Sequence, residues 1–216
     1  MSYTEYIQSY KEGLDFQPTD SVSYELCGIS IKIDTYEYSD ATSYHDMVHI
    51  TLESYGKTYE FDCIEAQSYQ KMFHPVSISG ESFLLFRRTL YGFSLINTES
   101  FEIYDYFPEK VCNGEESFIV CEAKSFGNLI IFDGCYWAFP YSFYAYDHQN
   151  RLFLDLSKEY MVQAEDKMEI QGDTLILNGS DKNEKKITVS IEYDELCKRM
   201  SQKGLHDFDE PFVVSQ

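Results

Sequence analysis

The sequence predicts an all-β protein with mainly antiparallel strands, built from blade-like β-meander units and carrying one or two short helices. Four segments alternate apolar and polar residues, three strand-length runs are continuously apolar, and helical periodicity is confined to two short stretches. The 19 Tyr and 16 Phe residues favour pleated, half-buried surfaces. Such units assemble either as a small or incomplete propeller or as a β-sandwich, and the pattern leaves both open.

Alternation with a period of two marks strands near both ends of the chain. The alternating segments are residues 29–34, 48–53, 58–62 and 187–192. Each segment places one face in a core and the other in water, as antiparallel sheets do. Residues 54–57 and 181–184 have the composition of hairpin turns between such strands.

The centre of the chain has a different pattern, in which apolar residues follow one another without a break. These runs are residues 83–86, 118–121 and 129–132. Strands of this kind are covered on both faces. We therefore expect four of their side chains to be largely buried: Phe118, Val120, Leu129 and Ile131.

Two stretches favour helices. Residues 3–11 predict a short N-terminal helix, and residues 194–203 predict a C-terminal one. Asp194 is the expected N-cap of the second helix, and Gly204 is the expected stop. The remaining residues, 205–216, fit a tail or a last extended strand.

The central runs belong to a repeat. Residues 82–107 and 128–156 each begin with an apolar strand and continue with two further strands around a polar turn, and their starts are 46 residues apart. This period is that of a propeller blade. Residues 175–193 form a weaker third copy. Any all-β chain shows hairpins at such intervals, so the repeat predicts meander units in a single domain, 1–216, without proving a closed ring.

The negative charge of the chain limits the classes of partner that we expect. Lys and Arg number 17 against 37 Asp and Glu, giving a net charge of −20. Basic residues never cluster beyond a pair, so neither nucleic acid nor an anionic membrane surface is an expected partner. A large net charge serves solubility, and it also suits a basic protein partner. The oligomeric state is left open.

Cysteine and histidine spacing predicts no cofactor and no metal. The cysteines are Cys27, Cys63, Cys112, Cys121, Cys135 and Cys197, and none forms a CxxC pair. The first residues lack the basic and apolar regions of a signal peptide, and no apolar run is long enough to span a membrane. These features predict a cytoplasmic protein with reduced thiols.

The segment with the only Trp holds the candidate binding residues. Tyr136, Trp137 and Tyr141 could form an aromatic stacking platform, and the carboxylates of Asp133 and Asp147 flank it. Together with His148, the carboxylates of Asp133 and Asp147 could also perform acid–base chemistry.

A structural interpretation of the same segment competes with this one. Asp133-Gly134 has the composition of a turn, and residues 147–150 that of a polar loop. Pro140 cannot donate to a sheet ladder. The stretch 135–141 is therefore expected to be primarily a corner pinned by its aromatic rings.

Part of the chain resembles a family of uncharacterised bacterial proteins with a D-G-C-Y-W-A-x-P-Y signature. The matching motifs lie at residues 91–92, 97–100, 106–109, 133–141 and 146–148. Phe139 and Ser142 depart from the pattern, where a small residue or Cys and then Glu would be expected. The resemblance covers about a third of the chain and implies blade-like, propeller-type β repeats, with no activity attached.

The sequence nominates no enzyme, although it does not exclude one. G-x-S-x-G, H-E-x-x-H, P-loop and GxGxxG motifs are all absent, and Cys135 has no identifiable His partner. The preferred hypothesis is a non-catalytic protein-interaction module that presents an acidic surface. The alternatives are small-ligand or carbohydrate binding at 135–141 and, third, a hydrolase that uses scattered acids.

Overall fold

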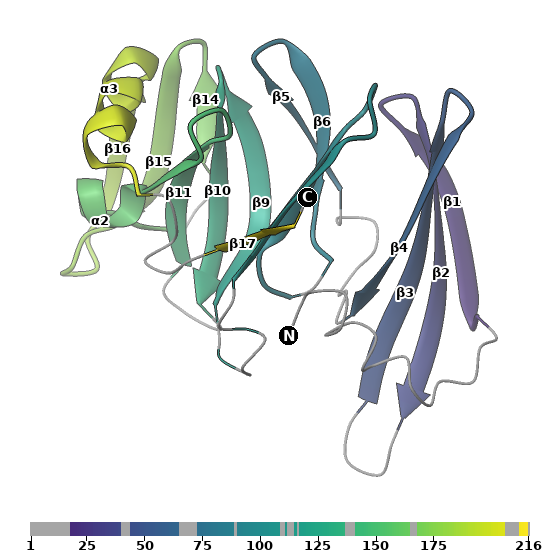
Figure 1. Ribbon diagram of the computed structural model, residues 1–216. Helices are drawn as coiled ribbons and strands as arrows, with labels where there is room; N and C mark the ends of the chain where they lie inside the picture. The colour runs from purple at the N-terminus through teal and green to yellow at the C-terminus, as the bar shows by residue number, and fades with distance from the viewer. Residues whose placement is uncertain are drawn as a thin grey trace. The chain divides into compact units, whose positions relative to one another are not determined.

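The computed structural model describes most of the chain, in two compact units. The described residues are 18–39, 44–64, 73–88, 90–108, 111, 115, 117–136, 141–164, 168–205 and 212–215. Unit 1 comprises Met1–Pro75, Ser82–Glu115 and Val213–Gln216, and unit 2 comprises Val76–Glu81 and Glu116–Phe212. Figure 1 shows that β-strands dominate both units. The single domain expected over 1–216 stays a prediction.

The first sheet of unit 1 is a four-stranded antiparallel meander (Figure 1, purple to blue). Its strands are β1 (Asp20–Leu26), β2 (Ile29–Ser39), β3 (Tyr44–Ser54) and β4 (Lys57–Ile64). The turn between β3 and β4 lies at Tyr55 and Gly56, as expected, and both residues have a positive φ. Each strand of this sheet pairs with its neighbour in the chain.

A second sheet follows in the order β17-β8-β7-β6-β5. Its strands are β5 (His74–Ile78), β6 (Glu81–Phe86), β7 (Phe93–Asn97), β8 (Ile103–Pro108) and β17 (Phe212–Ser215). The antiparallel meander β6–β7–β8 falls within the expected repeat at residues 82–107. All four residues of the apolar run 83–86 are buried, as predicted.

The core of unit 1 lies between β2–β4 and the strands β6 and β7. The first group contributes Ile29, Ile31, Ile33, Val48, Ile50, Leu52, Phe61 and Cys63, and the second Leu84, Phe86 and Ile96. The rings of Phe61 and Phe86 stack with their centroids 4.7 Å apart. Burial of the alternating residues of β2 and β3 confirms the period-two prediction, and their polar neighbours line the opposite face.

Unit 2 is built on a larger antiparallel sheet of order β14-β15-β13-β11-β10-β9, in which β12 pairs with β11 and β16 with β15. Its strands are β9 (Phe118–Phe126), β10 (Leu129–Tyr136), β11 (Tyr141–Asp147), β12 (Leu152–Asp155), β13 (Gln163–Ala164), β14 (Glu169–Gln171), β15 (Thr174–Ser180) and β16 (Lys186–Glu192). The antiparallel strands β10–β12 lie in the second expected repeat, 128–156, and β15–β16 in the weaker third copy. Phe118, Val120, Leu129 and Ile131 are each at most 2% exposed, which confirms their predicted burial.

Two helices complete the described part of unit 2. Helix α3 (Tyr193–Lys203) matches the predicted C-terminal helix, but its N-cap is Glu192 and not Asp194. It buries Leu196 and Met200 against the core formed by the sheet. Helix α2 (Leu156–Tyr160) was not predicted, and its first residue was expected to end a strand. The side chain of Asp155 caps this helix by accepting a hydrogen bond from the backbone N–H of Lys158. The N-terminal helix expected at 3–11 lies outside the described residues.

Within the described part of the chain, no helix is both long and apolar enough to cross a membrane.

Candidate functional site

The structure corrects the expected turn at Asp133-Gly134. Both residues lie inside β10, at a shift of register against β9, where Asp133 pairs with Glu122 and Gly134 with Val120. A Cβ atom on Gly134 would lie 2.0 Å from the backbone oxygen of Ile119. Glycine is therefore required by a close approach of two backbones at a β-bulge, not by a turn.

Asp133 is the most perturbed carboxyl group of this region. Its Oδ1 atom is buried and has no hydrogen-bond partner among the described residues. Burial first, and then the negative charge of Glu122, raise the pKa of Asp133 to about 6, while Lys124 opposes the rise. The Lys124 ammonium donates a hydrogen bond to the Met168 carbonyl oxygen at 2.8 Å and forms an ion pair with Glu122 at 3.3 Å. Asp133 thus has an acid and a base on the neighbouring strand but lacks a direct partner for Oδ1.

Tyr141 joins this group from β11. It pairs across the ladder with Cys135, so the two residues lie opposite each other. The charges of Cys121 and Cys135 raise the pKa of Tyr141, and burial and Asp133 contribute in the same direction. The structure therefore brings the candidates Asp133 and Tyr141 together.

The other predicted residues of the aromatic segment cannot be compared with the structure. Trp137 lies outside the described residues, as do Phe139 and Pro140, and the side chain of Tyr136 is not described. The stacking platform and the corner expected at 135–141 therefore stay predictions. Glu122, Lys124 and Cys121 were missed because only the β9–β10 register places them beside Asp133.

Asp147, the second candidate carboxylate, lies elsewhere on the same sheet. It pairs with Leu129, four residues along β10 from Asp133. At about 3.3 Å per residue, the backbones of the two acids are roughly 13 Å apart along the strand. Because strand side chains stand roughly perpendicular to the sheet, the two carboxyl groups keep about this separation, which is larger than the spacing of about 5–9.5 Å between the carboxyl groups of glycoside hydrolases. The structure does not join Asp133 and Asp147 into one site.

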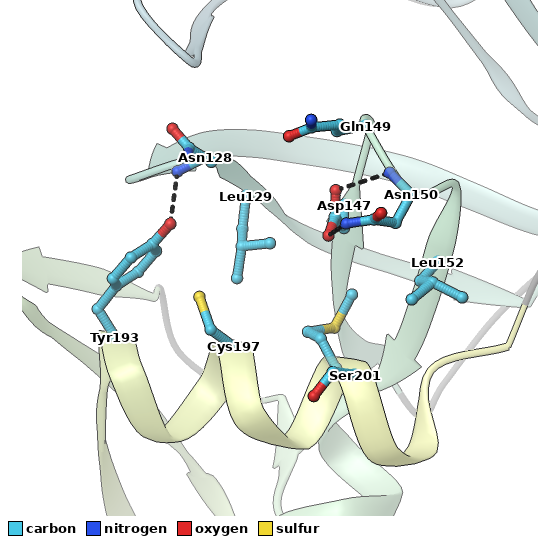
Figure 2. A pocket seen from close by; sticks show the side chains of 10 residues that line it. Asn128, Leu129, Asp147, Gln149, Asn150, Leu152, Tyr193, Cys197 and Ser201 are labelled. Atoms are coloured by element: carbon cyan, nitrogen blue, oxygen red, sulfur yellow. Dashed lines mark hydrogen bonds between the residues drawn. The ribbon is translucent and has the colours of Figure 1, made fainter.

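Asp147 instead lines a pocket of about 550 Å³ in unit 2. Figure 2 shows the pocket between α3 and two β-turns, one at Asn128 and the other at Gln149 and Asn150. The carboxylate of Asp147 accepts hydrogen bonds from the backbone N–H of Asn150 at 3.0 Å and from its side-chain amide at 2.7 Å. The polar loop expected at residues 147–150 is confirmed.

Helix α3 supplies one wall of the pocket. Tyr193, Cys197, Met200 and Ser201 recur at helical spacing and so share one face of the helix. The Tyr193 hydroxyl accepts a hydrogen bond from the backbone N–H of Asn128 at 3.0 Å, and burial raises the pKa of this phenol. The wall is thereby tied to the β9–β10 turn opposite it.

A third feature is the outward face of β1–β4 in unit 1, which we call the polar face. It comprises twelve polar side chains that the strand register places on one face: Ser21, Ser23, Glu25, Ser30, Lys32, Asp34, His49, Thr51, Glu53, Thr58, Glu60 and Asp62. Beyond Asp34 and His49, the same side of β2 and β3 continues with Tyr36 and Met47. Five of the twelve polar residues are acids and one is a lysine. The face is therefore strongly negative.

Part of the polar face is held in a fixed arrangement. Asp34, His49 and Asp62 lie directly opposite one another on β2, β3 and β4. The Asp34 carboxylate accepts hydrogen bonds from the Ser21 hydroxyl at 2.6 Å and the Lys32 ammonium at 2.7 Å. Burial opposes the ionisation of Asp34, but these hydrogen bonds outweigh it and lower the pKa of the carboxyl. The Nδ1 atom of His49 lies 2.9 Å from Asp62 Oδ1.

In the part of the chain that the structure describes, no three His, Cys, Asp or Glu side chains are grouped so that they could hold a metal ion.

Comparison with known proteins adds no family. No protein-family model matches the chain, and no curated protein matches it. One solved structure that it resembles is that of MPT-1, a GDP-Man-dependent mannosyltransferase from Leishmania mexicana, at 9% identity and a TM-score of 0.34. The match covers 85% of this chain and 71% of that one. A TM-score this low does not establish a shared fold, so the match supports no conclusion about function.

Proposed function

We propose that this chain is a non-catalytic protein-interaction module whose polar face binds a basic segment of a partner protein. The observation that carries the proposal is the charge of that face: Glu25, Asp34, Glu53, Glu60 and Asp62 stand against the single lysine, Lys32. Complementary charge steers association and selects among partners. The net charge of −20 acts in the same direction at longer range.

The geometry of the face suits an extended basic segment. Neighbouring strands lie about 4.8 Å apart, and residues on one face of a strand repeat about every 6.6 Å. Glu53 and Glu60 are exposed and lie on adjacent strands, so they can contact the Lys or Arg side chains of a partner. The buried carboxylate of Asp34 and the half-buried one of Asp62 are held by contacts within the face, so their negative charges keep fixed positions before a partner binds.

The proposal includes a setting. Cys27, Cys63, Cys121, Cys135 and Cys197 are free thiols, which supports a reducing compartment, and we place the protein in the cytoplasm of a bacterium. The successive antiparallel meanders support a propeller-like scaffold. We propose no nucleic acid or membrane as a partner, because the exposed charge has the wrong sign for both.

The test compares two triple variants with the same change in charge. One carries Glu25→Gln, Glu53→Gln and Glu60→Gln on the polar face, and the control carries Glu169→Gln, Asp173→Asn and Glu184→Gln in unit 2. All six residues are exposed. The probe is a fluorescein-labelled peptide of alternating Lys and Thr, and the measurement is fluorescence anisotropy at 150 mM salt.

The polar-face variant should bind the peptide about tenfold more weakly, because three exposed ion pairs contribute up to about 1 kcal/mol each. The control variant should lose less than about twofold. Equal losses in the two variants would show binding by net charge alone, and unchanged binding in the polar-face variant would place any basic partner elsewhere. Either result would overturn the proposal.

A further inference from the structure

We propose that the pocket between α3 and the two β-turns of unit 2 binds a neutral, polyhydroxylated small molecule of monosaccharide size. This site is separate from the polar face and independent of the function proposed for it. It also differs from the aromatic segment 135–141, because Asp147 pairs with Leu129, at the start of β10, and Tyr141 with Cys135, near its end.

The size and layout of the pocket fit such a ligand. Its volume of about 550 Å³ lies in the range of about 300–1,000 Å³ that is common for small-molecule sites. Leu129 and Met200, each 2% exposed, give it an apolar base together with Leu152. Such a base can pack against the C–H faces of a sugar ring, while the polar groups around it meet the hydroxyls.

The polar groups of the lining determine the class of ligand. Asn128, Gln149 and Asn150 carry amides, and Tyr193 and Ser201 carry hydroxyls. The Ser201 hydroxyl donates to the Lys198 carbonyl oxygen at 2.9 Å, and the Asn128 side-chain oxygen accepts from the Ser79 backbone N–H at 3.2 Å. Toward a ligand, Ser201 therefore offers an acceptor, Asn128 its amide donor and Gln149 both, so the lining as a whole supplies donors and acceptors. The hydroxyls of a polyol have the same dual character. A ligand with many hydroxyls can therefore pair with this lining in a way that a purely anionic or cationic ligand cannot.

The charge of the lining supports the same conclusion. Among the described residues that line the pocket there is neither Lys nor Arg, so a phosphate or carboxylate would find no counter-ion in this lining. Asp147, the one acid among these described lining residues, accepts two hydrogen bonds from Asn150, and a carboxylate has about four lone-pair sites. Its remaining lone pairs can accept hydrogen bonds from two neighbouring hydroxyls of a ligand.

The walls of the pocket are fixed before any ligand arrives. The Tyr193 ring packs so closely on Gly127 that a Cβ atom there would lie 2.4 Å from it, and the Tyr193 hydroxyl is held by the Asn128 backbone. Asp147 holds the turn on the other side through Asn150. A site formed in advance pays little ordering entropy on binding.

Cys197 allows a direct test, because its thiol lines the pocket (Figure 2). The full chain is alkylated with iodoacetamide, and mass spectrometry follows the rate at each cysteine. The probes, at millimolar concentration, are D-glucose, D-mannose, D-galactose and N-acetyl-D-glucosamine, with putrescine as a cation and glucose 6-phosphate as an anion. Cys27, exposed in the β1–β2 turn of unit 1, is the internal control.

At least one neutral sugar should slow alkylation of Cys197 about threefold or more and leave Cys27 unchanged. Gln149→Ala, at an exposed turn residue, should weaken this protection about 3- to 10-fold through loss of a hydrogen-bonding group. Gln202→Ala, at an exposed residue of α3 outside the lining, should leave it unchanged. Protection by none of the sugars, stronger protection by putrescine or glucose 6-phosphate, or equal effects of the two variants would overturn the proposal.

Discussion

Asp133 and Asp147 share one sheet, one face and neighbouring strands, yet their surroundings differ sharply. Asp147 is the last residue of β11. In the turn that follows, the backbone N–H and the side-chain amide of Asn150 each donate a hydrogen bond to one oxygen of the Asp147 carboxylate. Asp133 lies inside β10, where the backbone groups are committed to the ladder, and its Oδ1 has no partner among the described residues. A carboxylate at a strand end is satisfied by its own turn, whereas one inside a strand depends on neighbours distant in sequence.

The largest expected effect tests the core beneath both acids. Ile131 lies two residues from Asp133 on the same face and is 0% exposed. Ile131→Ala should lower the free energy of unfolding by about 2–5 kcal/mol, because it removes buried methylene groups and leaves a cavity. Urea denaturation measures this loss. A change below about 0.5 kcal/mol would mean that this face is not packed as described.

The next effect concerns the bulge beside Asp133. Gly134→Ala would place a methyl group 2.0 Å from the Ile119 carbonyl oxygen, so the two strands would have to separate. We expect a loss of about 2–3 kcal/mol in the same urea experiment. Gly172→Ala is the control: space around its Cβ is open and only its positive φ of 59° opposes the change, so it should cost about 1 kcal/mol. Equal costs at the two sites would argue against the close approach at Gly134.

A third prediction concerns the ionisation of Asp133. Its pKa is about 6 when folded, against an ordinary value of 3.8, so ionisation is less favourable in the folded chain than in the unfolded one. This penalty is absent below the unfolded pKa, grows as the pH rises, and is complete above about 6. The full shift equals about 3 kcal/mol, and partial exposure of the carboxyl reduces it to about 1–2 kcal/mol.

Asp133→Asn removes this penalty. The variant should therefore gain about 1–2 kcal/mol relative to the parent chain when the pH of the urea experiment is raised from 4 to 8. Glu122 and Lys124 on β9 and Tyr141 on β11 remain as they are in both proteins. A stability difference that stays constant across this range would show that Asp133 ionises normally.

The smallest effect is expected at Asp147. Asp147→Ala removes two hydrogen bonds to Asn150 in an exposed turn and should cost about 1 kcal/mol at pH 7. Asn150→Ala, which removes only the side-chain bond, should cost less. Thermal melting of the two variants beside the parent gives the order. A larger loss for Asn150→Ala would assign the turn's stability to Asn150 and not to the carboxylate.

Sequence reasoning succeeded where the determining pattern is local. The alternation around Ile31 and Ile50 correctly predicted which face is buried, and the turns at 54–57 and 181–184 follow from their own residues. Helix α3 was predicted one residue late at its start and correctly at its end. Helix α2 was missed because its five residues carry no period, and a single capping side chain, Asp155, starts it.

The sites were predicted less completely because they depend on strand pairing. Asp133 and Tyr141 were identified from their residue types and from their place beside the only Trp. Glu122 and Cys121 lie near them only because of the bulged register between β9 and β10. The pocket combines Asn128, Asp147 and Cys197, and no sequence period links a turn, a strand end and a helix. Asp-Gly pairs occur both in turns and at β-bulges, and the sequence alone does not distinguish the two, so Gly134 was assigned to a turn although it lies at a bulge.

The connectivity of β1–β4 has a consequence for the time course of folding. Each strand pairs with the preceding one, and the turns at Cys27-Gly28 and Tyr55-Gly56 close two of the three pairs over very short loops. Short closures cost little chain entropy, so these pairs can form by local search. In unit 2, β13 pairs with both β11 and β15 and must find strands on either side of it in the chain. The polar face therefore belongs to a sheet whose strands can pair early in folding. The larger sheet of unit 2 can be completed only after segments distant in the chain have come into contact.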